Sequence, residues 1–322
     1  MIDGIRIVVA ADERTDVRRA MDVATGLAHP RQAAVHVLRV VPHRGASVFA
    51  GTDAGDLRDH GDAIVPRSLL ADDRRTAGDL HVRSRVLEGD PRRVIPAYVQ
   101  LIDASMVVLG GDYGTSRFWR SARGVDEIVR QSPVPVLVLP TRRTSGRDAR
   151  RLHRILTPVD FSVASAVAMR TAMDLGRRDG ARVTLLHSLT DVPRRMVFSG
   201  SEAWRIIRRL PAEREAASDH LRSTAALFGA GDVDTAVATG VAETAMLEMA
   251  ARGDTDLIVM GVARRSWLDR FLFGSTLRRL LPRVPVPVLV VPVVAGTYAW
   301  PGPISPRRAT AHGPIQPERV AA

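Results

Sequence analysis

The sequence predicts an α/β fold made of two tandem domains, each with a parallel sheet covered by helices. Short runs of Val, Ile and Leu alternate with longer segments of helical period, which is typical of strands buried on both faces by crossover helices. This alternation occurs twice along the chain. The length of 322 residues suits two domains of about 150 residues each.

An internal repeat defines the two copies. Three pairs of segments match: 5–12 (IRIVVAAD) with 153–160 (HRILTPVD), 89–110 with 240–261, and 133–140 (PVPVLVLP) with 285–292 (PVPVLVVP). The spacings are 148, 151 and 152 residues, so they drift by only four residues over the whole domain. A repeat this regular predicts two copies of one structural unit.

Each copy is expected to contain five strands, the first and last of which are apolar on both faces. In the second copy the strands are expected at 154–159, 182–187, 233–239, 256–260 and 286–291. The helices are expected at 163–178, 202–228 with a break at Pro211, 242–252 and 275–281. The first copy has corresponding elements, with a shorter second helical region at 66–78.

These elements divide the chain into four parts. Residues 1–142 form the first domain and 153–294 the second, with a polar linker at 143–152 between them. Residues 295–322 contain Pro and Gly without any periodicity, and we expect this tail to be disordered.

Composition narrows the classes of function. The chain has no cysteine, which excludes disulfides, thiolate nucleophiles and cysteine-ligated metals. The net charge of +11 comes from 46 basic residues that are all arginine. Either a compositional bias or a polyanion partner explains this charge, and we favour the bias, so we expect no nucleic-acid partner. Neither a leader pattern nor an apolar membrane span is recognisable, and we expect a cytoplasmic protein.

The second copy carries the pattern of an anion-binding loop. Ligands of open parallel sheets bind outside the carboxyl ends of the strands, near the point where strand order reverses. Gly261 follows the fourth strand, and nine residues separate Arg264 from Gly274. Ser275 and Thr276 then open a helix, whose free N–H groups and hydroxyls suit phosphate oxygens.

Each of these residues also has a simpler interpretation. Asp160, at the end of the first strand, could hold a ribose hydroxyl or an adenine amino group, or it could cap the helix that begins near Val163. Gly261 could form an ordinary turn, and Gly274 with Ser275 an ordinary helix cap. The combination of Asp160 with glycines 13 residues apart favours a nucleotide site.

Several segments together resemble the universal stress protein family. They are Pro158–Asp160, His187, 256–261 (DLIVMG), Gly274–Ser275 and 285–291 (PVPVLVV). The resemblance covers both copies but not the tail, and it implies Rossmann-like domains with strand order 3-2-1-4-5. ATP-binding members carry glycine, two residues, glycine, nine residues, then glycine with serine or threonine. In this chain Arg264 stands at the second glycine, where it adds charge and takes up space.

The resemblance also implies roles for individual residues. Asp160 would hold the adenosine end of ATP, and Ser188 and Met260 would line the base and ribose pocket. Gly261, Gly274 and Ser275 would hold the phosphates. The expected ligand is ATP, with or without Mg²⁺, and the remaining members of the expected site are Pro158, Val159, Arg264 and Thr276.

The first copy is expected to have a degenerate site. It keeps Asp12 and Gly110, but Ala122 and Arg123 stand at the positions of the Gly-Ser pair. A second frame, starting at Gly111, restores the glycine spacing but has no hydroxyl residue after the last glycine.

Strand five reads Val-Pro-Val-Leu-Val in both copies, and family members associate through this edge. The two copies are therefore expected to form an intramolecular pseudo-dimer, and a homodimer of chains stays open.

No catalytic machinery is recognisable. Without lysine the chain has no Walker phosphate loop, and it has neither a nucleophile elbow nor a zinc-binding helix. His187 is interpreted as a packed residue at a strand end, and we expect at most slow ATP hydrolysis. Two functions remain: an ATP-binding stress-response module acting mainly through the second domain, or an interaction scaffold of the same fold that binds no nucleotide.

Overall fold

In a computed structural model, the described residues are 5–11, 17–28, 34–41, 81–110, 122–140, 152–189, 200–227, 233–263 and 273–293. Residues 143–151 of the expected linker at 143–152, the helical region at 66–78 and the tail at 295–322 lie outside them.

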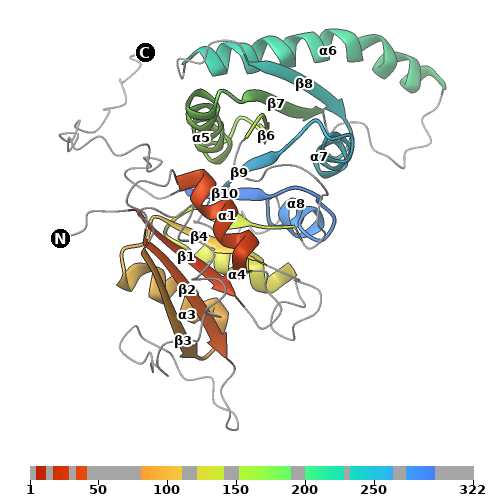
Figure 1. Ribbon diagram of the computed structural model, residues 1–322. Helices are drawn as coiled ribbons and strands as arrows, with labels where there is room; N and C mark the ends of the chain where they lie inside the picture. The colour runs from red at the N-terminus through yellow and green to blue at the C-terminus, as the bar shows by residue number, and fades with distance from the viewer. Residues whose placement is uncertain are drawn as a thin grey trace, which may run out of the picture.

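Each copy contributes five strands and its own helices (Figure 1). The first copy consists of β1 (Arg6–Ala11), α1 (Val17–Ala28), β2 (Ala34–Val41), β3 (His81–Glu88), α3 (Pro91–Leu101), β4 (Met106–Leu109), α4 (Ala122–Gln131) and β5 (Val136–Val138). The second consists of β6 (Arg154–Pro158), α5 (Val163–Asp179), β7 (Arg182–Leu189), α6 (Gly200–Leu227), β8 (Asp234–Thr239), α7 (Ala242–Ala251), β9 (Leu257–Ala263), α8 (Phe273–Leu280) and β10 (Val288–Val293).

All ten strands form one sheet in the order β3-β2-β1-β4-β5-β10-β9-β6-β7-β8. Within each copy the strands are parallel, and the order 3-2-1-4-5 occurs twice, as the family resemblance implies. The copies meet at β5 and β10, which pair antiparallel. The two apolar strands that the sequence places at the contact between the copies therefore lie in the middle of the sheet.

The sheet has an apolar core on each face. Alternate residues of a strand enter different cores: Ile155 belongs to the core that includes residues of α1, α5 and α6, whereas Leu156 belongs to the core that includes residues of α3, α4, α7 and α8. Since both faces are covered, the inner strands β1, β4, β5, β9 and β10 consist almost entirely of apolar residues. This explains why the first strand of each copy is a continuous apolar run.

Helix ends follow local capping rules. Ser162 caps α5, accepting a hydrogen bond from the Ser165 N–H at 3.2 Å, and Gly180 ends the helix with a φ of 67°. Asp90 caps α3 directly before Pro91.

Two expected boundaries are wrong. The strand β9 does not end before Gly261 but continues to Ala263, because its last residues still pair with β10. The helix α6 is not broken at Pro211. Residues 211–216 are exposed, so core packing does not constrain the helix from Pro211 onward, and the helix tolerates the hydrogen bond that this proline cannot donate.

Candidate functional site

The carboxyl ends of β6, β7 and β9 meet at one edge of the second copy. The strand β6 pairs with β7 on one side and with β9 on the other, so chain order reverses between β6 and β9. Ligands of open α/β sheets bind at such a reversal. This edge brings together six of the residues expected in the site: Pro158, Val159, Asp160, Ser188, Met260 and Gly261.

Asp160 follows β6 and is exposed. Its Oδ1 atom accepts two hydrogen bonds from Ser162, one from the backbone N–H at 3.1 Å and one from the hydroxyl at 2.6 Å. Ser162, not Asp160, is the cap of α5. Among the described residues Oδ2 has no partner, so this atom can accept a hydrogen bond from a ligand hydroxyl or amino group.

Phe161 is a neighbour of Asp160 that sequence reasoning did not identify. Its φ of 62° lies in the left-handed region, which bulky residues rarely adopt. Its ring stacks on His220 of α6 with the centroids 4.2 Å apart, and it contacts His187 of β7 at 4.8 Å. A cluster of three rings therefore forms at the residue that follows Asp160. No sequence spacing indicates this cluster, because the rings come from three separate segments.

His187 has the structural role that the sequence predicts. Its Nδ1 atom lies 2.7 Å from the Val159 carbonyl oxygen. Since a carbonyl can only accept, Nδ1 carries the proton and donates it to this hydrogen bond. The bond ties the end of β7 to the residue before Asp160 and helps to fix the aspartate at the edge of the sheet.

Two of the expected site residues already have partners within the protein. The Ser188 hydroxyl donates to the Gly240 carbonyl at 2.5 Å. At Gly261 a Cβ atom would lie 1.8 Å from the Ala164 carbonyl oxygen, so the first turn of α5 occupies the space of a side chain. Met260 is buried in the core. Gly261 thus has a packing role whether or not an anion binds near it.

The phosphate-binding part of the expected site is only partly described. Arg264 and the rest of residues 264–272 lie outside the described residues. The helix α8 begins at Phe273, which places Gly274 and Ser275 in its first turn, and Thr276 is half-buried. A helix that follows a parallel strand begins at the carboxyl edge of the sheet, which is the edge that carries Asp160.

In the first copy the equivalent edge differs in sequence. Asp12 and residues 111–121 lie outside the described residues, and Ala122 is the first residue of α4. Gly124, the last glycine of the second frame, lies inside α4 and is buried. Like Gly274 in α8, it lies in the first turn of its helix, but Val125 follows it where Ser275 follows Gly274.

The described part of the chain contains neither a membrane-spanning helix nor a cluster of metal ligands. No helix in this part of the chain is long and apolar enough to cross a membrane. No group of three or more His, Cys, Asp or Glu side chains in it is arranged to hold a metal ion.

Comparisons with known proteins agree with the repeat. The model of the universal stress protein family matches residues 5–140 and again 151–292. A universal stress protein of Methanocaldococcus jannaschii is 29% identical over 147 residues, which cover 45% of this chain and 85% of that protein.

Solved structures match both copies at once. A universal stress protein from Archaeoglobus fulgidus superposes with a TM-score of 0.58 at 16% identity, covering 89% of this chain and 96% of that one. A functionally unknown protein from Pseudomonas aeruginosa gives a TM-score of 0.59 at 18% identity, covering 90% and 93%. At these identities the likeness concerns the fold.

Proposed function

Since the chain belongs to the universal stress protein family, we propose that it is a stress-response protein that binds ATP at the carboxyl edge of its second copy. The observation that carries the proposal is the position of Asp160. The carboxylate stands exposed at the reversal of strand order, with Oδ1 fixed by Ser162 and Oδ2 available to a ligand. The first turn of α8 supplies N–H groups at the same edge for the phosphates.

The proposed site contains Pro158, Val159, Asp160, Ser188, Met260, Gly261, Arg264, Gly274, Ser275 and Thr276. Asp160 would accept from the ribose or the adenine, because a carboxylate with a free oxygen suits a hydroxyl or amino donor. Ser275 and Thr276 would donate to phosphate oxygens. Arginine at position 264 would pair with a phosphate. In this scheme the protein holds the nucleotide and has no dedicated enzymatic activity, at most slow hydrolysis of ATP.

The two copies provide a matched test. Asp160→Asn preserves the shape of the side chain and an oxygen for Ser162, but it removes the negative charge. We expect this change to weaken binding of labelled ATP about tenfold, since hydrogen bonds to charged groups contribute about 1.5–3 kcal/mol. Asp12→Asn, the same change in the first copy, should leave binding unchanged.

The phosphate loop is tested separately. Gly274→Ala and Ser275→Ala should each weaken ATP binding by about tenfold, since both remove space or a donor from the first turn of α8. If neither these variants nor Asp160→Asn bind ATP less tightly than the unmodified chain, the proposed site is wrong.

One observation favours the alternative function of a scaffold that binds no nucleotide. Ser188 and Gly261 both have internal partners, the Gly240 carbonyl and the Ala164 backbone. Such contacts explain these residues without a ligand. The nucleotide content of the purified protein distinguishes the two functions, because a scaffold would copurify with none.

We also infer that the β5–β10 pair is the intramolecular equivalent of a dimer contact. It joins the same strand of each copy and buries an edge that would otherwise expose apolar residues. The contact requires no second chain.

A further inference from the structure

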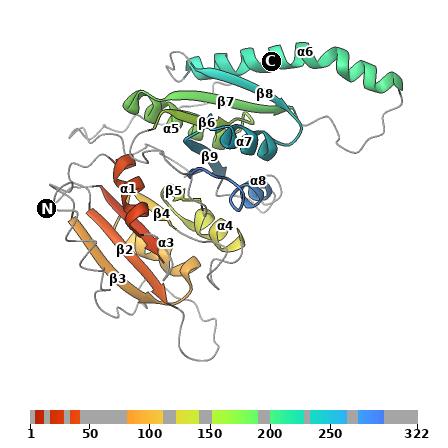
Figure 2. The ribbon, with the colours of Figure 1, turned by 45° about the vertical axis from the view of Figure 1, so that its right-hand side comes forward.

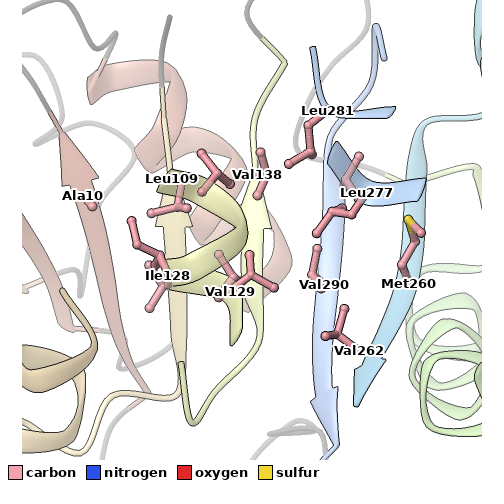
Figure 3. Close-up of a cluster of buried hydrophobic side chains, with 14 of the residues drawn as sticks. Ala10, Leu109, Ile128, Val129, Val138, Met260, Val262, Leu277, Leu281 and Val290 are labelled. Atoms are coloured by element: carbon pink, nitrogen blue, oxygen red, sulfur yellow. The ribbon is translucent and has the colours of Figure 1, made fainter. Parts of the chain in front are cut away.

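The contact between the two copies, which we call the seam, consists of β5, β10, α4 and α8 and has a local two-fold symmetry. Leu137 pairs with Leu289 in the antiparallel ladder, and these two residues are equivalent in the repeat at a spacing of 152. On one face of the sheet α4 and α8 pack against each other above this pair. Figure 3 shows their apolar side chains together with those of β5 and β10; they include Ile128, Val129, Val138, Leu277, Leu281 and Val290.

A symmetric seam does not by itself favour the pairing of a first copy with a second copy over the pairing of two first copies or of two second copies. In an isologous contact the same patch meets itself, so a first copy could pair with the first copy of another chain. The strand residues of the seam are identical in both copies, Val-Leu-Val in β5 and in β10, but the helices differ: Leu277 and Leu280 of α8 stand where α4 has Val125 and Ile128. These aliphatic residues differ only in size, so the charged residues are the chemical difference between α4 and α8.

The charges of the two helices are inverted. At the spacing of 152, Asp126 of α4 corresponds to Arg278 of α8, and Glu127 corresponds to Arg279. The helix of the first copy thus carries two adjacent acidic residues where the helix of the second carries two basic ones.

Glu127 and Arg279 point away from the seam. Glu127 pairs with Arg92 of α3 at 3.4 Å, and Arg279 pairs with Glu243 of α7, also at 3.4 Å. The helices α3, α4, α8 and α7 follow one another across the sheet, so α3 and α7 are the outer neighbours (Figures 1 and 2). These two ion pairs hold each helix to its own copy.

Asp126 and Arg278 lie on the opposite flanks. Successive residues of a helix are about 100° apart around its axis. With Val125, Ile128 and Val129 buried against the sheet, Glu127 takes the flank toward α3, and Asp126 takes the flank toward α8. The Asp126 side chain is 16% exposed and that of Glu127 46%, as expected if Asp126 lies beside a packed helix. By the symmetry of the seam, Arg278 is on the flank of α8 toward α4.

We propose that Asp126 and Arg278 determine which copies pair across this seam. When a first copy meets a second copy, a negative flank faces a positive one. When two second copies meet, Arg278 faces Arg278, and like charges disfavour the contact. When two first copies meet, each Asp126 is held by its own Arg130 at 3.1 Å, so the repulsion is weaker. The discrimination therefore acts mainly against pairing of second copies.

A charge-exchange cycle in the full chain tests the attraction. Asp126→Arg and Arg278→Asp each place like charges on facing flanks, and the double variant restores opposite charges. At low salt we expect a coupling of about two- to fivefold in the unfolding equilibrium constant, the range of exposed ion pairs, and we expect salt to reduce it. The matched cycle combines Glu127→Arg with Arg279→Glu, two residues that face different helices. Here the changes in the unfolding equilibrium constant caused by the two single substitutions should multiply, which means that the coupling is absent.

If a charge reversal prevents folding, the milder cycle of Asp126→Asn with Arg278→Gln measures the same coupling. Equal coupling in the 126/278 and 127/279 cycles, or none in either, would overturn the assignment.

Discrimination against like copies is tested by cross-linking. The chain has no cysteine, so Leu289→Cys introduces a single thiol at the symmetry axis, where two second copies would place their thiols opposite each other. Oxidation should yield several-fold more disulfide-linked dimer when Arg278→Ala is added, and no more when Arg279→Ala is added instead. The same yield with both alanine variants would show that Arg278 does not oppose this contact.

Discussion

The two copies share a backbone plan but differ in how they satisfy polar groups. In the first copy Val9 and Ala104 are buried in apolar surroundings. At the same positions the second copy has Thr157 and Thr255, whose buried hydroxyls have no hydrogen-bond partner among the described residues. A buried hydroxyl without a partner costs stability. The comparison shows that apolar strands and their order define this fold, while single polar groups within it can diverge.

A second difference lies at the start of corresponding helices. Asp90 caps α3, and its carboxylate also binds the Arg92 guanidinium at 2.9 Å. Val241 stands at the same place before α7 and forms no side-chain cap. The first copy thus has a local stabilising device that the second lacks, although both helices form. Substitutions that exchange these features between the copies measure what each contributes.

The largest effect is expected at Gly261, where the second copy packs most tightly. In Gly261→Ala the new methyl group would lie 1.8 Å from the Ala164 oxygen and 2.3 Å from its carbonyl carbon. The first turn of α5 must move, and we expect a loss of about 3 kcal/mol in the free energy of unfolding. Urea denaturation measures the loss.

Gly180→Ala is the matched control for this prediction. Gly180 has a φ of 67° and open space where a side chain would lie, so only backbone strain of about 1 kcal/mol is expected. If the free energy of unfolding falls equally in both variants, close packing of α5 against β9 at Gly261 does not limit the size of the side chain at this position.

The second prediction exchanges Val9 and Thr157. Both positions are fully buried. Thr157→Val removes the unpaired hydroxyl and should raise the free energy of unfolding by about 1 kcal/mol, whereas Val9→Thr buries a new hydroxyl and should lower it by about 1–3 kcal/mol. The urea midpoints of the two variants should therefore move in opposite directions. A destabilised Thr157→Val chain would mean that its hydroxyl has a partner after all.

Much of this fold can be predicted from the sequence, because its main determinants are local and repeated. The apolar runs predict buried parallel strands, and their recurrence at nearly constant spacing predicts two copies. The identical Val-Pro-Val-Leu-Val strands indicate the contact between the copies. A resemblance to a known family supplies the strand order, which periodicity alone does not determine.

What the sequence does not predict depends on contacts between distant segments. Gly261 is interpreted as the end of a strand, but pairing with β10 carries β9 past it. Pro211 is interpreted as a helix break, but an exposed helix tolerates it. Phe161 has a positive φ and contacts rings from β7 and α6, which are distant in the sequence and come together only on folding. In the candidate site, the sequence predicts that Asp160 follows a buried strand. It does not predict which residues of other elements lie beside this strand end.

The smallest predicted effect compares the helix caps. Asp90→Ala removes the cap of α3 and should lower the free energy of unfolding by about 1 kcal/mol at neutral pH. Val241→Asp adds the missing cap to α7 and should raise the free energy of unfolding by about 0.5 kcal/mol. The gain is smaller than the loss at Asp90, because the new cap must also order its own side chain. Thermal unfolding of both variants beside the unmodified chain measures the difference. Equal melting temperatures for all three chains would show that the first copy gains nothing from Asp90.

The contribution of Asp90 should also depend on pH. Burial alone would raise the pKa of this carboxyl, but hydrogen bonds from the Arg92 side chain and backbone, together with the nearby arginine charges, hold the pKa below its ordinary value of 3.8. A carboxyl with a depressed pKa in the folded state stabilises the fold above the unfolded-state pKa, and it loses this effect as the pH falls through the folded-state value. The stability difference between the unmodified chain and Asp90→Ala should therefore be constant from pH 7 to about 5 and shrink below about pH 4. Val241→Ala, which removes no carboxyl, should show no such trend, and a difference that persists in acid would mean that Asp90 acts through packing and not through its charge.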